Sequence, residues 1–103
     1  MFSINPGKVS DADREAIRMA LIAELDAINL YEQLAESTSP DVRKVLLDIA
    51  REEKTHVGEF QALLERYDDE QAMENVAGKK EVKELIGKEK TPAKQKPNGV
   101  MYG

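Results

Sequence analysis

Two long stretches of the chain repeat apolar residues in steps that alternate between four and three, the spacing of one buried face on an α-helix. The first stretch runs from Ser10 to about Glu36, and the second from Pro40 to Tyr67. We therefore predict two amphipathic helices over these ranges. The rows consist of Ile17, Leu21, Glu24, Ile28, Tyr31 and Ala35 in the first stretch, and of Val42, Leu46, Ile49, Glu53, His56, Phe60, Leu63 and Tyr67 in the second.

A short polar connection separates the two predicted helices. Ser39 is a favourable N-cap residue, and Pro40 suits the first helical position because no backbone N–H is needed there. Helices joined by so few residues pack as antiparallel neighbours. The sequence therefore predicts an all-α fold built on an antiparallel two-helix hairpin.

The other segments are assigned by their composition. Residues 1–9 lack helical periodicity and are expected to form an irregular N-terminal arm, while residues 10–67 form the hairpin. Residues 68–87 predict a short C-terminal helix that Gly78 interrupts, since glycine weakens a helix interior. Residues 88–103 contain lysine and proline with few apolar side chains, so we expect a flexible tail.

Three polar residues, Glu24, Glu53 and His56, interrupt the apolar rows. A buried carboxylate without a partner is costly, and neither row contains a lysine or arginine to pair with it. Glu24 lies fourteen residues before Thr38. Glu53 lies fourteen residues after Ser39, so in an antiparallel hairpin both stand roughly 20 Å from the turn. His56 is one helical turn from Glu53, and the three side chains are predicted to converge.

This set, a glutamate from one helix and Glu-x-x-His from its neighbour, is half of the ligand set of a carboxylate-bridged di-iron site in a four-helix bundle. A two-fold dimer would complete both the bundle and the site, because each residue then meets its symmetry mate. Oxygen and imidazole ligands suit iron, with zinc, manganese or calcium as expected substitutes. The alternative is a hydrated polar patch in the groove of the hairpin.

Length and composition narrow the classes of function. A chain of 103 residues has a marginal core, which oligomerisation commonly remedies. The chain has no cysteine, which excludes iron–sulfur clusters and thiolate zinc sites, and its net charge of -5 disfavours a nucleic-acid partner. The longest apolar run, residues 19–23, is far below the roughly 20 residues of a membrane span, and no signal peptide is expected.

Two segments, Ala-Glu-Leu-Asp-Ala-Ile-Asn-Leu-Tyr-Glu (23–32) and Arg-Glu-Glu-Lys-Thr-His (51–56), resemble the encapsulated ferritins, a branch of the ferritin-like superfamily, in residues and in spacing. The resemblance implies that Glu24, Glu53 and His56 ligate iron. It also implies ferroxidase activity at a di-iron centre between two subunits, and assembly of dimers into a ring of ten subunits.

The resemblance further implies a setting and additional residues. The ring would lie in the cytoplasm, inside an encapsulin nanocompartment that stores the oxidised iron, and the tail would dock to the encapsulin shell. Tyr31 would lie beside the ligands and take part in catalysis, whereas by pattern alone it is an ordinary packing aromatic. Asp26 fits an acidic metal-access position of the family and is otherwise a surface acid. Ala23 and Leu30 depart from the family pattern at that access position.

Two other functions fit the same residues. A structural or interaction module would use zinc or paired carboxylates only to hold a helical dimer together. A rubrerythrin-like peroxidase would reduce hydrogen peroxide at the same centre, although such proteins usually add an iron site with cysteine ligands, and this chain has no cysteine. Oxidation of bound iron distinguishes a ferroxidase from a structural module, which would show none. A preference for oxygen or for hydrogen peroxide as oxidant distinguishes a ferroxidase from a peroxidase.

Overall fold

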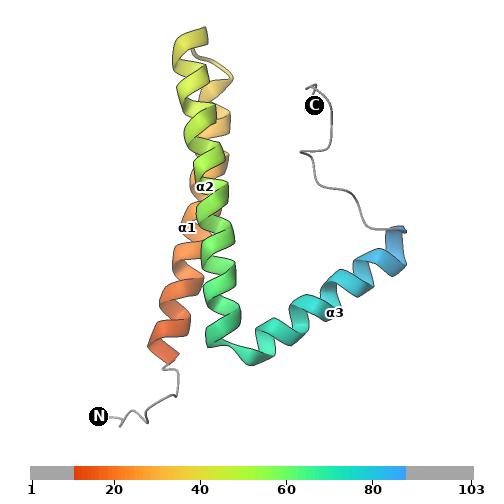
Figure 1. The fold of residues 1–103 in the computed structure, drawn as a ribbon. Coiled ribbons are helices and arrows are strands. Elements are labelled where there is room, and N and C mark those ends of the chain that lie inside the picture. Colours follow the sequence, from red (N-terminus) through yellow and green to blue (C-terminus); the bar gives the residue numbers. More distant parts are fainter. Residues whose placement is uncertain (1–10, 88–103) are drawn as a thin grey trace. The chain divides into compact units, whose positions relative to one another are not determined.

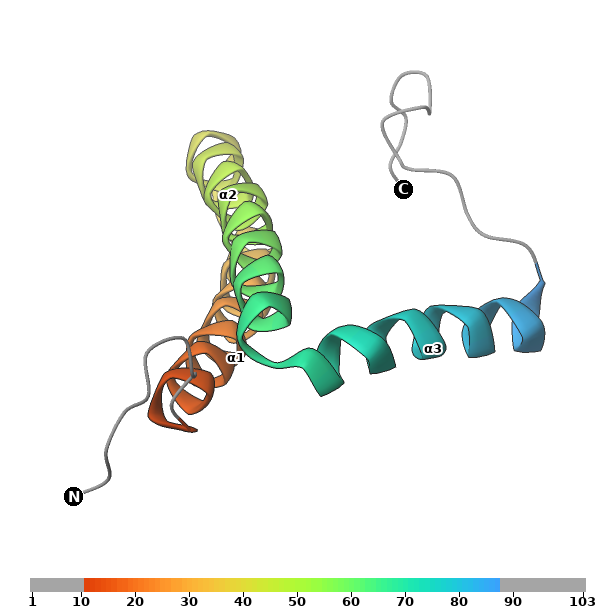
Figure 2. The same ribbon diagram turned by 60° about the horizontal axis from the view of Figure 1, so that its bottom comes forward.

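The computed structural model describes residues 11–87, and every regular element in that range is helical. Helix α1 spans Asp11–Ala35, α2 spans Pro40–Tyr67 and α3 spans Asp69–Ile86. Helices α1 and α2 lie side by side and antiparallel, as Figures 1 and 2 show from two directions. The predicted all-α hairpin with a C-terminal helix is thereby confirmed.

Hydrogen bonds close the turn between α1 and α2. The Thr38 hydroxyl donates to the carbonyl of Ala35 at 3.1 Å, which satisfies one of the free carbonyls at the end of α1. Ser39 occupies the N-cap with extended backbone, and Pro40 follows it, although the Ser39 side chain makes no capping hydrogen bond. The backbone N–H of Arg43 donates to the Ser39 carbonyl at 2.8 Å. The connection is therefore short and internally bonded, which favours the antiparallel pairing.

Two arginines of α1 contact the far end of the hairpin. Asp68 ends α2 with extended backbone, and its carboxylate accepts the backbone N–H of Gln71 at 3.0 Å, which caps the start of α3. The same carboxylate accepts a hydrogen bond from Arg18 at 2.7 Å. Arg14 donates to the carbonyl of Tyr67 at 3.5 Å. The residue that separates α2 from α3 is thus bonded to α1, a feature that helical periodicity does not reveal.

The chain divides into two structural units after Ala72, so that the hairpin and the first turn of α3 form one unit and the rest of α3 belongs to the other. Helix α3 continues through Gly78, so the interruption predicted there is wrong. Glycine costs a helix only about 1 kcal/mol relative to alanine, and alanine, lysine and glutamate surround it. The helix ends before Gly87, whose φ of 104° is a conformation that favours glycine, and whose N–H donates to the Lys83 carbonyl at 2.8 Å.

The core of the hairpin is small, and it corrects the row predicted on α2. Ile17, Ile28, Ala35, Ala50 and Leu64 are its buried hydrophobic side chains. The buried and half-buried positions of α2 that follow one row are Leu46, Ala50, Glu53, Val57, Phe60, Leu64 and Tyr67. Leu63, which the sequence predicted in this row, is exposed, and Leu64 takes its place.

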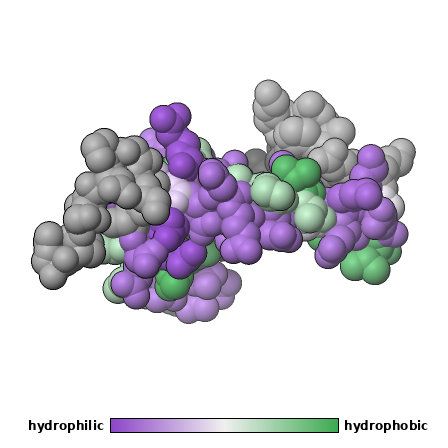
Figure 3. Space-filling view, turned by 90° about the horizontal axis from the view of Figure 1, so that it is seen from below, coloured by the Kyte–Doolittle hydropathy of each residue, from purple (hydrophilic) through white to green (hydrophobic). Residues whose placement is uncertain are grey.

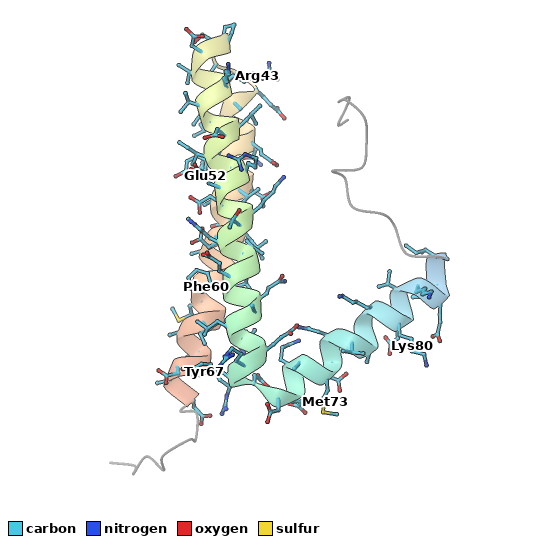
Figure 4. The ribbon with its side chains drawn as sticks, viewed as in Figure 1. Arg43, Glu52, Phe60, Tyr67, Met73 and Lys80 are labelled. Atoms are coloured by element: carbon cyan, nitrogen blue, oxygen red, sulfur yellow. The ribbon has the colours of Figure 1, made fainter. Side chains whose placement is uncertain are left out.

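The error has a geometric cause. The predicted row alternates between two sets, each with a spacing of seven residues, that lie on neighbouring stripes of the helix. The set containing Glu53 and Phe60 is half-buried. The set containing Val42, His56 and Leu63 is exposed at these three positions. The side chains of α2 are drawn in Figure 4, in which Phe60 and Tyr67 are labelled.

Many large hydrophobic side chains of the single chain remain in contact with solvent, and Figure 3 shows several of them, in green, among hydrophilic neighbours. Within residues 11–87 none of the helices has both the length and the apolar content that crossing a membrane requires. Exposed hydrophobic area of this extent is typical of a surface that another molecule covers.

The reassigned row predicts unequal effects of two leucine truncations on α2. Leu64 is 7% exposed, whereas Leu47 is 42% exposed. Leu64→Ala should lower the free energy of unfolding by about 2–4 kcal/mol, since it leaves a cavity beside α1, and Leu47→Ala by less than about 1 kcal/mol. Urea unfolding followed by circular dichroism measures both. Equal losses would contradict the assignment of Leu64 to the core.

Candidate metal centre

Three acid–base side chains meet halfway along the hairpin. Glu24 comes from α1, and Glu53 and His56 come from α2, one turn apart. One ligand atom from each lies within 4.8 Å of the others. Nδ1 of His56 is 2.9 Å from Oε1 of Glu53 and 3.5 Å from Oε2 of Glu24. The structure therefore brings together the three residues that the sequence placed at one height.

The three side chains differ in exposure. The side chains of Glu24 and Glu53 are 21% and 18% exposed, because both lie on the rows along which α1 and α2 meet. His56 is 47% exposed, because it stands on the neighbouring stripe of α2 rather than in the row that faces α1. The expectation of an interior imidazole is corrected accordingly. The cluster has two carboxylates inside the hairpin and an imidazole at its open edge.

Hydrogen bonds within the cluster shift all three pKa values. The pKa of Glu24 is raised above its usual value, chiefly by a hydrogen bond with Glu53 and then by burial. The pKa of Glu53 is lowered, chiefly by hydrogen bonds from Glu24 and His56. The pKa of His56 is raised, chiefly by its hydrogen bond with Glu53. The cluster thus satisfies itself by sharing protons, which a bound cation would displace.

The donor set fits a transition metal. Two carboxylates and one imidazole offer oxygen and nitrogen atoms, a combination that suits Fe²⁺, Mn²⁺ and Zn²⁺. Bond lengths of about 2 Å to such ions need only modest side-chain rotation from the observed spread. Glu24, Glu53 and His56 would hold the ion. Three residues do not fill the coordination shell of iron, so the site of one chain leaves positions open.

The other residues predicted for the site lie apart from the cluster. Tyr31 stands two turns after Glu24 on the same row of α1 and is half-buried. Asp26 is exposed and lies roughly 200° around α1 from Glu24. Its carboxylate is therefore directed away from the cluster. Nearby, Lys54 Nζ pairs with Glu32 Oε2 across the hairpin at 3.4 Å.

Most of the chain matches a known protein family. The rubrerythrin family model matches residues 15–100. In the described range these residues include nearly all of α1 and the whole of α2 and α3. The match therefore covers the hairpin, the three converging side chains and the C-terminal helix together.

Similar proteins of known sequence are associated with encapsulins by name. The chain is 55% identical over 95 residues to a ferritin-like-encapsulin shell fusion protein of Pyrococcus furiosus, a match covering 84% of this chain and 28% of that protein. It is 39% identical over 72 residues to the encapsulin nanocompartment cargo protein EncC of Myxococcus xanthus, covering 68% of this chain and 55% of that protein. The chain thus spans between about a quarter and about half of the length of these relatives.

A solved structure extends the likeness to three dimensions. The crystal structure of the encapsulated ferritin domain from Pyrococcus furiosus matches with a TM-score of 0.74 and 52% sequence identity. The match covers 87% of this chain and all of that domain. Sequence identity at this level indicates that the two proteins share both the fold and the family. The chain therefore belongs to the rubrerythrin family of ferritin-like proteins and, as its sequence predicts, resembles the encapsulated ferritins.

Proposed function

We propose that the chain is a ferroxidase, which oxidises Fe(II) to Fe(III) with oxygen at a di-iron centre formed between two copies. The observation that carries the proposal is the convergence of Glu24, Glu53 and His56, whose ligand atoms lie within 4.8 Å of one another. The donor atoms of these three side chains suit iron. Membership of the rubrerythrin family supports the function of an iron-dependent oxidoreductase.

A second copy is needed to complete the centre. Side chains on the stripe of α2 that carries His56 are largely apolar and exposed, and Leu30 and Leu34 on α1 are exposed as well. The apolar members of that stripe are Val42, Val45 and Leu63, which are exposed, and Ile49, which is half-buried. A two-fold axis through this face would place two sets of ligands around two ions and cover the apolar surface at the same time.

In the proposed dimer, Glu24, Glu53 and His56 of both copies bind ferrous iron, which is the substrate. Four carboxylates and two imidazoles from two copies offset the charge of two ions in a partly desolvated site. Glu24 from α1 is the proposed bridging ligand, and Glu53 with His56 forms the terminal pair on α2. His56 ligates only as neutral imidazole, so its proton must leave before the ion binds. Two ferrous ions would together give two electrons to one O₂ molecule, which would take up two protons and leave as hydrogen peroxide, and both ions would be released as ferric iron.

The relatives support an encapsulin setting. One is named as a fusion to an encapsulin shell and two as encapsulin cargo proteins. We propose that this chain also acts inside an encapsulin nanocompartment in the cytoplasm and delivers ferric iron to it for storage and detoxification. The expected docking segment, 88–103, and the N-terminal arm, 1–9, lie outside the described residues. Assembly into a ring of ten subunits stays a prediction from the resemblance.

The family match favours one alternative activity. Rubrerythrin is the name of the matching family, and a peroxidase of that kind would use hydrogen peroxide as oxidant at the same three residues. Comparing oxygen with hydrogen peroxide in stopped-flow oxidation of bound Fe(II) separates the two functions. A rate that is much higher with peroxide would favour the peroxidase.

Removing one ligand should abolish most of the oxidation. Glu53→Gln and His56→Ala should each lower the rate of Fe(II) oxidation at least about tenfold. Substitution of residues that only hydrogen-bond to a metal ligand already lowers metal affinity or activity by that factor. Anaerobic protein is loaded with Fe(II), mixed with air and followed by ferric absorbance. Glu36→Gln, an exposed acid just beyond α1, is the matched control and should oxidise normally. Undiminished oxidation by the ligand variants would reject the assignment.

Metal should also drive dimerisation. Zn²⁺ cannot be oxidised, so it tests binding without turnover. Analytical ultracentrifugation with Zn²⁺ should show a dimer whose dissociation constant is at least about tenfold lower than in EDTA, because the ions bind the paired state more tightly than a single copy. The His56→Ala variant should lose this response to metal. A wild-type chain that stays monomeric in saturating Zn²⁺ would contradict a shared centre.

Metal affinity should rise with pH. The pKa values of Glu24 and His56 are raised, so these groups keep their protons to a higher pH than usual and protons compete with the metal. Zn²⁺ affinity should therefore increase through the pKa of His56, which the hydrogen bond with Glu53 holds above the ordinary imidazole value, and level off beyond it. Isothermal titration in two buffers of different protonation enthalpy should detect proton release. NMR titration of the single histidine measures its pKa directly, and Glu53→Gln should lower it.

A further inference from the structure

Three polar side chains of α1 bond across the hairpin, and all three lie along one edge of it. Arg18 donates to the Asp68 carboxylate at 2.7 Å, and Glu32 Oε2 lies 3.4 Å from Nζ of Lys54. Arg14 donates to the last carbonyl of α2 at 3.5 Å. Arg14 and Glu32 are eighteen residues apart, which is five full turns, and Arg18 lies about 40° from them. The three residues therefore share one edge of α1.

The metal-binding cluster opens at the other edge of the hairpin. On α2, His56 stands roughly 160° around the helix from Lys54, on the opposite flank of the row that faces α1. Glu53 lies in that row between them, and its side chain is 18% exposed. Helix α2 is thus tied to α1 at Lys54 on one flank and presents His56 on the other.

The contact between Lys54 and Glu32 runs diagonally across the two helices. Lys54 lies fifteen residues after Ser39, whereas Glu32 lies only six residues before Thr38. Helical side chains lean toward the N-terminus of their own helix, so on antiparallel helices these two lean toward each other. A diagonal tie of this kind resists both rotation of α2 about its axis and sliding of α2 along α1.

The apolar pattern of α2 determines its rotation only weakly. The neighbouring stripe, which carries His56, is about 60° away from the row that faces α1. A rotation of α2 by that angle would bring His56 between the helices and turn Glu53 and Lys54 away from α1. The row that faces α1 has the apolar side chains Leu46, Ala50, Val57, Phe60 and Leu64, and the neighbouring stripe has Val42, Val45, Ile49 and Leu63.

We propose that Lys54 and Glu32 are positioning residues, which hold α2 at the rotation where Glu53 faces Glu24 and His56 stays at the open edge. Lys54 directly follows Glu53 in the sequence, so a tie at residue 54 fixes the direction of the ligand beside it. This role rests on the proposed function in that it concerns metal binding by the same three side chains. The rotation itself is measured without metal.

Cysteine probes report the rotation of α2. The chain has no cysteine, so an introduced thiol is the only one. Leu64 is 7% exposed, and Leu64→Cys should react slowly with a thiol reagent in EDTA. Adding Lys54→Met or Glu32→Gln should speed this reaction about two- to fivefold, the range that an exposed ion pair supports. Residue 64 lies ten positions from Lys54, so loss of the lysine does not alter the thiol directly.

A second probe separates rotation from unfolding. Ala35 on α1 is 1% exposed, and Ala35→Cys should stay protected when Lys54→Met is added, because rotation of α2 leaves the row of α1 covered. An unchanged reaction rate at residue 64 would overturn the positioning role. So would equal increases at residues 35 and 64, since the pair would then only stabilise the hairpin.

Zn²⁺ affinity tests the consequence for the site. Lys54→Met removes a positive charge beside the ligands, so charge alone predicts tighter binding, whereas lost positioning predicts binding about two- to fivefold weaker. Arg51→Met is the matched control. Arg51 lies two residues from Glu53 and pairs with Asp48 of its own helix at 2.8 Å, so its loss removes the same charge and leaves the tie to α1 intact.

Isothermal titration at one protein concentration compares these variants. Arg51→Met should not weaken binding, and Lys54→Arg, which keeps the pair, should bind Zn²⁺ as the wild type does. Tighter binding by Lys54→Met than by wild type would overturn the positioning role. The thiol rates depend on neither metal nor oxygen, so a failure of the ferroxidase proposal is distinguishable from a failure of this one.

Discussion

The arrangement of the hairpin depends on two carboxylates and an imidazole that satisfy one another halfway along it. Neither arginine nor lysine lies within hydrogen-bonding distance of Glu24 or Glu53 among the contacts of the described residues, so His56 is their basic partner. Proton sharing makes the cluster tolerable without metal. The shared protons can also be replaced by metal, because each of them occupies a position that a divalent ion can take.

This cluster occupies space that a stable hairpin would otherwise fill with apolar side chains. Among residues 11–87, five hydrophobic residues are buried, and a much larger number of big apolar side chains stay exposed. A single copy therefore has a weak core and a large uncovered surface, a combination typical of chains whose folding and association are coupled. Part of this uncovered surface is the apolar stripe around the open edge of the cluster.

Helical spacing and turn chemistry predict much of this from the sequence. The count of fourteen residues on each side of the turn places Glu24 level with Glu53, because an α-helix rises uniformly. Spacing could not decide whether His56 faces α1 or solvent, because steps of four and three serve two neighbouring stripes equally well. Nor could it reveal that Arg18 contacts Asp68, since that contact joins residues fifty positions apart. Gly78 was predicted to interrupt the C-terminal helix because glycine weakens a helix interior. The good helix formers around Gly78 keep the helix continuous instead.

The exposed position of His56 has a consequence for how such a site fills. An imidazole inside the hairpin would admit a metal ion only when the helices separate. At the edge it can exchange its proton with solvent and rotate while Glu24 and Glu53 stay fixed between the helices. In the proposed dimer, a first ion would therefore reach the carboxylates from the open side of one copy, and the second copy would then close over it. Binding before closure is the order expected when the two acids lie between the helices and the imidazole lies at the edge.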